Sequence, residues 1–338
     1  MRELKVTENE AGQRLDKLLR KYLEQAPSGF LYKMLRKKNI VLNKKKASGK
    51  EILSRGDVIC LFLSEETIQK FLVGPKQSGI PKGYQGSLPQ IIYEDAHILV
   101  LNKPVGMLSQ KAAPQDVSVS DYVIDYLMAT EKLTAKELQT FRPSVCNRLD
   151  RNTSGLILAG TSLAGLQTLS ALLKDRTLAK YYLCLVKGRI QKQGVLTGYL
   201  TKDTLRNQVR IGREEEKEIV TQYDPIAWNQ EMTLLKVHLV TGRTHQIRAH
   251  LASAGHPLAG DGKYGDDKWN LQLKKRYGIC CQLLHAYEMH FPVIKQELAH
   301  LSQKRFQAPV PDSFGALIKE TVWEHGQQEA FAALHWKK

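Results

Sequence analysis

The sequence lacks the features of a disulfide-stabilised, zinc-binding or membrane-spanning protein. Its five cysteines are an odd number without a C-x-x-C pair, whereas disulfide frameworks and zinc ribbons need more cysteines at other spacings. No stretch approaches the roughly 18 consecutive apolar residues of a membrane helix, and the N-terminal MRELKVTENE carries acids where a signal peptide is apolar. We therefore expect no membrane partner and a reducing, cytoplasmic location. The cysteines are Cys60, Cys146, Cys184, Cys280 and Cys281.

Motifs of several enzyme classes are also absent. The sequence contains no P-loop, no G-x-S-x-G elbow and no Cys–His pair at the spacing of a known protease family. The segment from Gly260 to Gly265 fits G-x-G-x-x-G, but His256-Pro257 precedes it and Asp266-Asp267 follows it. A dinucleotide fold needs an apolar strand before this motif and a helix directly after it. We therefore do not expect a nucleotide cofactor here.

Positive charge is what the chain has in excess. Its 338 residues include 50 Lys and Arg against 34 Asp and Glu, a formal net charge of +16. With 42% hydrophobic residues the composition is globular, and the length predicts two domains or one large domain with a small one. Because basic residues that face phosphates release counterions, this surplus predicts a nucleic-acid partner.

The first 70 residues have the pattern of a small α+β domain. Apolar residues recur at helical spacing in GQRLDKLLRKYLEQ and in FLYKMLRKK, and NIVLN and GDVICLFL have the composition of strands. No acid occurs from Lys33 to Lys50, so the basic residues there form either an RNA-contacting patch or a solvated face; we favour RNA contact. They are Lys33, Arg36, Lys37, Lys38, Lys44, Lys45, Lys46 and Lys50.

This arrangement resembles the RNA-binding domain of the S-four ribosomal-protein type. Arg14-Leu15-Asp16 at the start of the first helix, Val41-Leu42-Asn43 and Gly56-Asp57 before the last strand match its pattern. The resemblance implies structured RNA as the ligand. The RNA-binding residues expected on this basis are Arg14, Lys33, Arg36, Lys37, Lys38, Lys44, Lys45 and Lys46.

Composition divides the rest of the chain. We expect a Gly- and Pro-rich linker over 71–89, a second domain over 90–310, and a C-terminal extension over 311–338 to which we assign no function. Apolar patterns in the second domain predict a mixed α/β, or α+β, fold. The expected strands lie near 91–93, 98–101, 156–159, 182–186 and 233–240, and the expected helices near 118–129, 162–173 and 244–254.

Two polar segments of the second domain could carry chemistry. Asp150 ends an apolar stretch just before a polar turn, where a carboxylate can reach a cleft, although an Asp in a turn is usually a backbone cap or turn former. The segment HLVTGRTHQIRAHLASAGH places arginines and histidines around an apolar stripe. His245 and His250 are five residues apart, so they lack the spacing of a helical metal site, and phosphate contact or plain solvation remains for the arginines.

Taken together, the segments resemble the RluA-type family of RNA pseudouridine synthases. Its Arg-Leu-Asp-x-x-Thr-Ser-Gly motif occurs at 148–155, its Lys-x-Tyr motif at 180–182, and Gly-Arg-Thr-His-Gln-Ile-Arg-x-His at 242–250. Asn102-Lys103-Pro104-x-Gly106 and Leu284-His285-Ala286 also match. One residue departs from the pattern, because Asn147 stands where the family usually has His, and this puts any role of a histidine there in doubt.

The resemblance implies an isomerase that turns uridine into pseudouridine in flipped-out bases of RNA, on a fold with one long, bent, largely antiparallel sheet. Asp150 would attack the sugar or the base, or remove a sugar proton, with Arg248 as its ion-pair partner. Tyr182 would stack on the uracil and place its hydroxyl for proton transfer. Substrate-binding roles fall to Arg148, Ile247, Arg243 and His245.

The reaction has no net redox change, so no cofactor or metal is expected. The appended basic domain implies large-subunit ribosomal RNA as the substrate, with transfer RNA as an alternative, and we expect a monomer. A non-catalytic RNA-binding assembly factor would lack the Asp, Tyr or Arg, and all three are present. An RNA methyltransferase would need a Gly-rich cofactor loop after a strand, which the sequence lacks.

Overall fold

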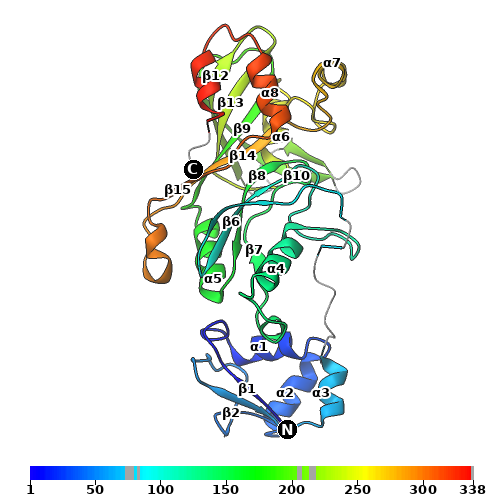
Figure 1. The fold of residues 1–338 in the computed structure, drawn as a ribbon, viewed down its shortest axis with the longest axis vertical. Helices are drawn as coiled ribbons and strands as arrows, with labels where there is room; N and C mark the ends of the chain where they lie inside the picture. Colours follow the sequence, from blue (N-terminus) through cyan, green and yellow to red (C-terminus); the bar gives the residue numbers. More distant parts are fainter. Residues whose placement is uncertain (73–79, 82–83, 204–207, 213–217, 336–338) are drawn as a thin grey trace.

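The N-terminal part of the chain is a small α+β unit. The computed structural model describes residues 1–72, 80–81, 84–203, 208–212 and 218–335. In the first 72 residues a four-stranded antiparallel sheet, in the order β1-β4-β2-β3, packs against three helices (Figure 1). The elements are β1 Arg2–Lys5, α1 Leu15–Tyr22, α2 Ser28–Arg36, β2 Ile40–Leu42, β3 Lys45–Lys46, β4 Val58–Leu61 and α3 Glu65–Phe71.

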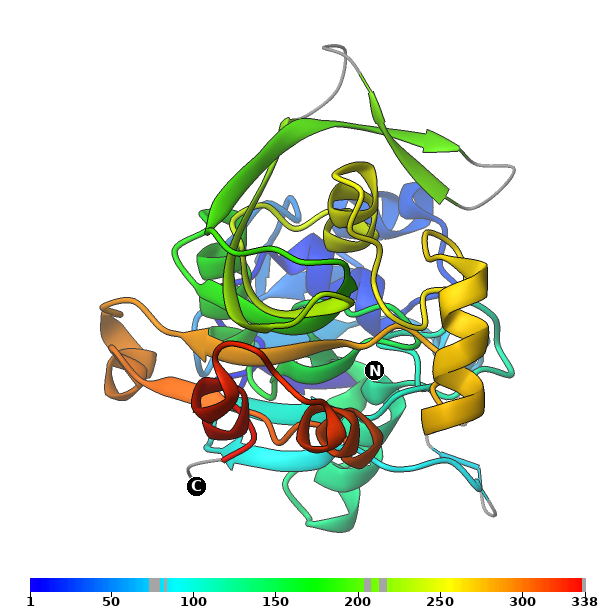
Figure 2. The ribbon, with the colours of Figure 1, turned by 90° about the horizontal axis from the view of Figure 1, so that it is seen from above.

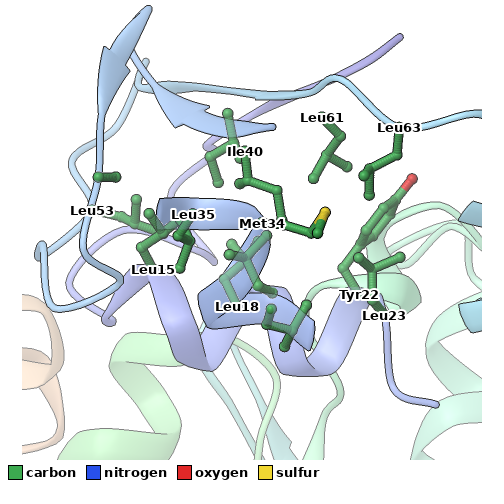
Figure 3. Close-up of a cluster of buried hydrophobic side chains, with 14 of the residues drawn as sticks. Leu15, Leu18, Tyr22, Leu23, Met34, Leu35, Ile40, Leu53, Leu61 and Leu63 are labelled. Carbon is green, nitrogen blue, oxygen red and sulfur yellow. The ribbon is translucent and has the colours of Figure 1, made fainter. Parts of the chain in front are cut away.

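The structure confirms the two helices and two strands that the apolar spacing predicts in this unit. Leu15 and Leu18 of α1 and Leu35 of α2 are buried together with Ile40 and Leu61 of the sheet (Figure 3). The sequence did not reveal β1 or α3, because RELK and EETIQKF contain too few apolar residues to show a period.

The N-terminal unit contacts the rest of the chain. Within the described residues, Thr140 Oγ1 donates a hydrogen bond to Glu10 Oε1 at 2.6 Å, and Leu163 N donates to Asn9 Oδ1 at 3.3 Å. Residues 73–79 and 82–83 of the predicted linker lie outside the described part. Ile80 beyond the first gap packs against the apolar cluster around α4 (Val119–Ala129).

The rest of the chain forms a mixed α/β body around an 11-stranded sheet (Figure 1). Its main path runs β11-β10-β12-β13-β9-β14-β8-β6-β5, with β15 beside β14 and β7 beside β8. The strands are β5 Gln90–Glu94, β6 Ile98–Lys103, β7 Ser144–Val145, β8 Ser154–Gly160, β9 Ala179–Lys187, β10 Gly194–Asp203, β11 Gln208–Gly212, β12 Glu218–Trp228, β13 Met232–Leu239, β14 Leu284–His290 and β15 Arg305–Gln307. The helices are α4, α5 Leu163–Lys174, α6 Gln246–Ser253, α7 Asp267–Tyr277, α8 Asp312–Glu320 and α9 Gln327–Ala332, with short 3₁₀ turns at Glu137–Gln139 and Gln296–Leu301.

This sheet confirms the expected fold class. Its paired strands are antiparallel except for β14 and β8, which run parallel. Seen from above, β10, β12 and β13 curve around α6 (Figure 2). The bend places α6 against β12, and so it brings residues of α6 to the concave face of the sheet.

Most predicted elements of this body are confirmed, and one prediction is partly wrong. The expected strands correspond to β5, β6, β8, β9 and β13, and the expected helices to α4, α5 and α6. The prediction that no helix follows the G-x-G-x-x-G segment is wrong: α7 begins at Asp267. Asp266 is its N-cap and accepts a hydrogen bond from Trp269 N at 2.8 Å. The element before the segment is α6, not a strand, so the dinucleotide fold remains excluded.

The C-terminal segment contributes to the core of the second body. Phe314 and Leu317 of α8 and Trp323 are buried in one cluster with Leu185 of β9 and Leu234 of β13. These helices therefore cover the face of the sheet opposite α6, which the mixed sequence of 311–338 did not indicate. In the described ranges, no helix has the length and apolar character to cross a membrane.

Candidate active site

Asp150 lies in a cleft of about 900 Å³ on the concave side of the sheet. The cleft is bordered by the 108–112 loop, the 145–153 segment, the end of α5, β9, and the 239–248 segment that leads into α6. Among the described residues that line it, Asp150 is the one acidic side chain. Basic side chains surround it: Lys111, Arg148, Arg151, Lys174, Arg176, Lys180, Arg243 and Arg248. Such a lining attracts a polyanion.

The segment that carries Asp150 is held from two sides. Ser109 Oγ donates to the carbonyl of Leu149 and accepts from its N–H, both at 2.9 Å. On the other side, the buried Lys103 Nζ donates to the carbonyl of Arg151 at 2.9 Å. Asp150 is thus flanked by two residues whose backbone is tied to the 108–112 loop and to the end of β6, which makes the turn a rigid support.

The turn leads into β8, and the first residues of β8 pair with β14. Ser154 Oγ lies 2.9 Å from Nδ1 of His285, whose pKa burial lowers to about 4, so the ring is neutral. Gly155 has a φ of +107°, and a Cβ there would lie 2.3 Å from the carbonyl oxygen of Ala286. The Thr-Ser-Gly and Leu-His-Ala motifs therefore meet, and only glycine permits the close approach.

Asn147, the departure from the family pattern, has a backbone partner of its own. Its Oδ1 accepts from Leu158 N at 2.7 Å, and its Nδ2 donates to the carbonyl of Leu156 at 3.4 Å. The side-chain amide therefore ties the segment between β7 and Asp150 to β8, a structural role that needs no histidine.

Arg248, on α6, lies between two carboxylates. Its Nη1 donates to Asp150 Oδ2 at 2.8 Å, while its Nε and Nη2 donate to Asp261 at 2.7 and 2.8 Å. Burial disfavours the guanidinium, but the hydrogen bonds and charges of Asp261 and Asp150 raise the pKa of Arg248 above its ordinary value. The predicted ion pair with Asp150 is present, and the arginine is a permanent cation.

His245 is the second polar neighbour of Asp150. It precedes α6 with a φ of 55°, and its Nε2 lies 3.7 Å from Asp150 Oδ2. Burial lowers the pKa of His245, partly opposed by the charge of Asp150, so the ring is neutral at neutral pH. His245 therefore faces Asp150 as a neutral hydrogen-bonding group.

Tyr182 and Ile247 form the apolar side of the cleft. Both are buried and belong to one cluster with Leu149. Burial raises the pKa of Tyr182, and the charge of Asp150 raises it further, so its hydroxyl stays protonated. As expected from strand alternation, Tyr181 lies on the opposite face, where Lys236 Nζ is 4.8 Å from its ring centre.

The remaining expected residues occupy two separate surfaces. Arg148 and Arg243 are exposed at the cleft. The lysines of the N-terminal unit and Arg36 are all exposed, and no ion pair involves them in the described part of the chain. Arg14 differs from them, because its Nε and Nη2 donate to Asp16 at 3.0 and 2.8 Å. That pairing gives Arg14 a structural partner beside any contact with RNA.

Four polar residues around Asp150 were missed in the sequence: Lys103, Ser109, Asp261 and Tyr264. Lys103 has a signal only as part of the Asn-Lys-Pro motif, and Ser109 has no local signal. Asp261 and Tyr264 lie within the G-x-G-x-x-G segment, whose residues indicate no role other than the excluded cofactor loop.

Comparisons with known proteins agree with this geometry. A model of the RNA pseudouridylate synthase family matches residues 97–253, which include Asp150, Tyr182 and Arg248. Ribosomal large subunit pseudouridine synthase C of Vibrio cholerae is 31% identical over 88% of this chain and 94% of its own length. The protein of the same name from Escherichia coli K12 is 34% identical, over 85% of this chain and 87% of its own.

A solved structure shows the same fold. Human RNA Pseudouridylate Synthase Domain Containing 4 superposes with a TM-score of 0.53 at 19% identity, covering 72% of this chain and 92% of that one. The relatives with more than 30% identity extend over most of both chains. The chain therefore belongs to the RluA-type family of RNA pseudouridine synthases, the isomerases that convert uridine in RNA to pseudouridine.

Proposed function

We propose that this enzyme isomerises uridines of large-subunit ribosomal RNA and that Asp150 is its catalytic carboxylate. The observation that carries the assignment of Asp150 is its position as the one acid among the described residues of a basic cleft, paired with Arg248. The substrate is supported by the relatives named as ribosomal large subunit pseudouridine synthases. The exposed lysines of the N-terminal unit add a second basic surface for structured RNA.

The cleft suits a flipped nucleotide. Unstacking a base costs on the order of a few kcal/mol, and contacts in the pocket must offset this cost. Tyr182 offers an aromatic face for the uracil, with Ile247 beside it as an apolar wall, and Arg148 at the rim fills the place that the base leaves in the RNA. Arg243 and His245 complete the substrate contacts on the α6 side.

Asp150 acts through its carboxylate, which pairs with Arg248. Arg248 fixes its orientation, and the carboxylate attacks the sugar or the base, or removes a sugar proton. The bond between N1 of the uracil and the sugar breaks, the uracil turns within the cleft, and carbon 5 forms the new bond to the sugar while Asp150 gives up the bond or proton that it took. Carbon 5 then loses its proton and N1 gains one. Tyr182, whose hydroxyl keeps its proton, relays this transfer by accepting at its oxygen as it donates its own proton.

We also propose the domain roles. Residues 1–70 serve as an RNA-binding domain of the S-four type, 71–89 as a linker and 90–310 as the catalytic domain, with the helices of 311–338 packed on it. The RNA-binding surface of the first domain comprises Lys33, Arg36, Lys37, Lys38, Lys44, Lys45 and Lys46, with Arg14 as a further contact. The enzyme acts as a monomer in the cytoplasm, where ribosomal RNA and unpaired cysteines both occur.

A site-by-site pseudouridine map of ribosomal and transfer RNA tests this proposal. Cells that lack the protein are compared with cells that express wild type, Asp150→Asn or Asp312→Asn, the last being a control at an exposed aspartate. We expect certain ribosomal sites to disappear and to return with wild type and Asp312→Asn only. Sites lost from transfer RNA alone would refute the substrate, and restoration by Asp150→Asn would refute the catalytic assignment.

A further inference from the structure

The turn from Asp261 to Tyr264 lies behind the catalytic pair. The carboxylate of Asp261 is completely buried and accepts four hydrogen bonds. Oδ2 accepts from Arg248 Nε at 2.7 Å, and Oδ1 accepts from Arg248 Nη2 at 2.8 Å and from the N–H groups of Lys263 and Tyr264 at 2.9 and 3.1 Å. Arg248 is thus held by a fork that is itself fixed to the backbone.

The turn is anchored to α7 and leaves no room to shift. Asn270 accepts from Gly260 N at 2.8 Å through Oδ1 and donates to the carbonyl of Asp261 at 3.0 Å through Nδ2. A Cβ on Gly260 would lie 2.2 Å from the Cys281 carbonyl oxygen, and one on Gly265 would lie 2.1 Å from that of Asp261. Gly260 and Gly265 of the G-x-G-x-x-G segment therefore serve this tight turn.

Tyr264, at the other end of the turn, orients His245. Its hydroxyl accepts from Val209 N at 2.8 Å, so its own proton is available for His245 Nδ1 at 3.0 Å. A neutral His245 then carries its proton on Nε2, the nitrogen that faces Asp150. The centre of the Tyr264 ring lies 5.2 Å from the guanidinium carbon of Arg248. The turn thus contacts both polar neighbours of Asp150.

We propose that Asp261 and Tyr264 are positioning residues for the isomerisation, which rests on the proposed role of Asp150. Asp261 occupies Nε and Nη2 of Arg248, so only Nη1 reaches Asp150. The contacts from Arg248 and His245 both reach Oδ2 of Asp150, which leaves Oδ1 outside the ion pair. Without Asp261, the fork of Arg248 is free to take both oxygens of Asp150 and so to block the reacting one.

Asp261→Asn tests the positioning role of Asp261 in single-turnover assays with ribosomal RNA. The amide oxygen can still accept from the backbone of the turn, but the charge and one acceptor for Arg248 are lost. We expect the rate of the chemical step to fall by about 100-fold, with the Kd for RNA within about threefold of wild type. The control is Asp266→Asn, which keeps an N-cap for α7 and should retain the wild-type rate.

A double-mutant cycle separates positioning from a general loss of structure. If Asp261 acts through Arg248, adding Asp261→Asn to Arg248→Lys lowers the rate no further, whereas independent damage multiplies the two effects. Tyr264→Phe tests the positioning role of Tyr264 without removing a buried charge, and it should lower the rate by about tenfold at unchanged RNA affinity.

Asp150→Asn is measured in parallel. Full activity of Asp150→Asn would overturn the proposed function itself. An inactive Asp150→Asn beside wild-type rates for Asp261→Asn and Tyr264→Phe would overturn the positioning role alone. Should Asp261→Asn fail to fold, the Tyr264→Phe rate decides: a tenfold loss at unchanged Kd supports the proposal, and a wild-type rate refutes it.

Discussion

Lys103 gives a direct test of how the turn that carries Asp150 is supported. Its side chain is completely buried, and Nζ donates to the carbonyls of Pro104, Met107 and Arg151 at 2.9, 2.7 and 2.9 Å. Burial lowers its pKa to about 7, although the charge of Asp150 opposes this shift. Lys103→Met keeps an unbranched chain that can fill the same space but removes every donor, so it separates hydrogen bonding from packing.

The expected loss of stability follows from the carbonyls that lose their donor. The Arg151 carbonyl keeps a second donor, Gly106 N at 3.0 Å, whereas Pro104 and Met107 have no other donor among the hydrogen bonds of the described residues. An unpaired buried acceptor costs about 1–3 kcal/mol. We therefore expect Lys103→Met to lower the free energy of unfolding by about 3 kcal/mol near pH 9, where the neutral amine still has two N–H groups for the carbonyls of Pro104 and Met107.

The pH dependence of this loss has a definite sign. Between the folded pKa of about 7 and the unfolded value of 10.5, the unfolded chain binds a proton that the folded chain has released. Wild-type stability therefore gains up to about 1.4 kcal/mol per pH unit in this window, and that gain is lost as pH falls through the folded pKa. The variant lacks the gain, so the difference between the two proteins shrinks from pH 9 towards pH 7.

Urea unfolding followed by tryptophan fluorescence measures this difference. The N-terminal unit contains no tryptophan, whereas Trp228, Trp269 and Trp323 lie in the catalytic body, so a change in their signal reports that body. Lys268→Met, at an exposed lysine of α7, is the control and should change stability little. A loss below about 0.5 kcal/mol near pH 9, or an equal loss at both pH values, would refute the reasoning.

Three further predictions follow from contacts described above. Tyr182→Phe should lower the single-turnover rate by about 100-fold while RNA binding in filter assays stays intact; an unchanged rate would remove the hydroxyl from the mechanism. Lys44→Glu, Lys45→Glu and Lys46→Glu together should weaken RNA binding. They should also make the slope of the logarithm of the RNA association constant against log salt shallower by about 0.7–0.9 per lost phosphate contact; an unchanged slope would show that these lysines do not contact RNA. Gly155→Ala should cost more than about 3 kcal/mol in thermal unfolding, because its Cβ would meet the Ala286 carbonyl. Gly242→Ala, where no atom lies within 4 Å, should be tolerated.

The side chains that we propose to react could be singled out in the sequence because their motifs are continuous. Asp150 and Arg248 each lie in such a motif, although 98 residues separate them and no local pattern pairs them. The resemblance to a family supplied that pairing. Apolar composition was sufficient for β8, which follows Asp150, for β9, which carries Tyr182, and for α6, which carries Arg248, because most residues of each element are buried.

Asp261 could not be predicted because its environment is created by tertiary structure. In the sequence it is an acid in a glycine-rich turn, a pattern typical of exposed loops. Its complete burial depends on Arg248 from α6 and on Asn270 from α7. For the same reason, α8 was not recognised as core: its apolar residues Phe314 and Leu317 have meaning only against β9, more than a hundred residues earlier in the chain.

The packing of α8 against β9 also constrains the order in which the protein is made. Domains of a growing chain fold from the N-terminus onwards. The core of the N-terminal unit lies within residues 4–72, so this unit can fold early in translation. Leu183 and Leu185 share their cluster with Trp269 and Leu273 of α7, but this cluster is complete only after Phe314 and Leu317 have been synthesised. The nascent catalytic body therefore keeps part of this apolar sheet face open until α8 is made, and we expect a chain that ends before α8 to be aggregation-prone.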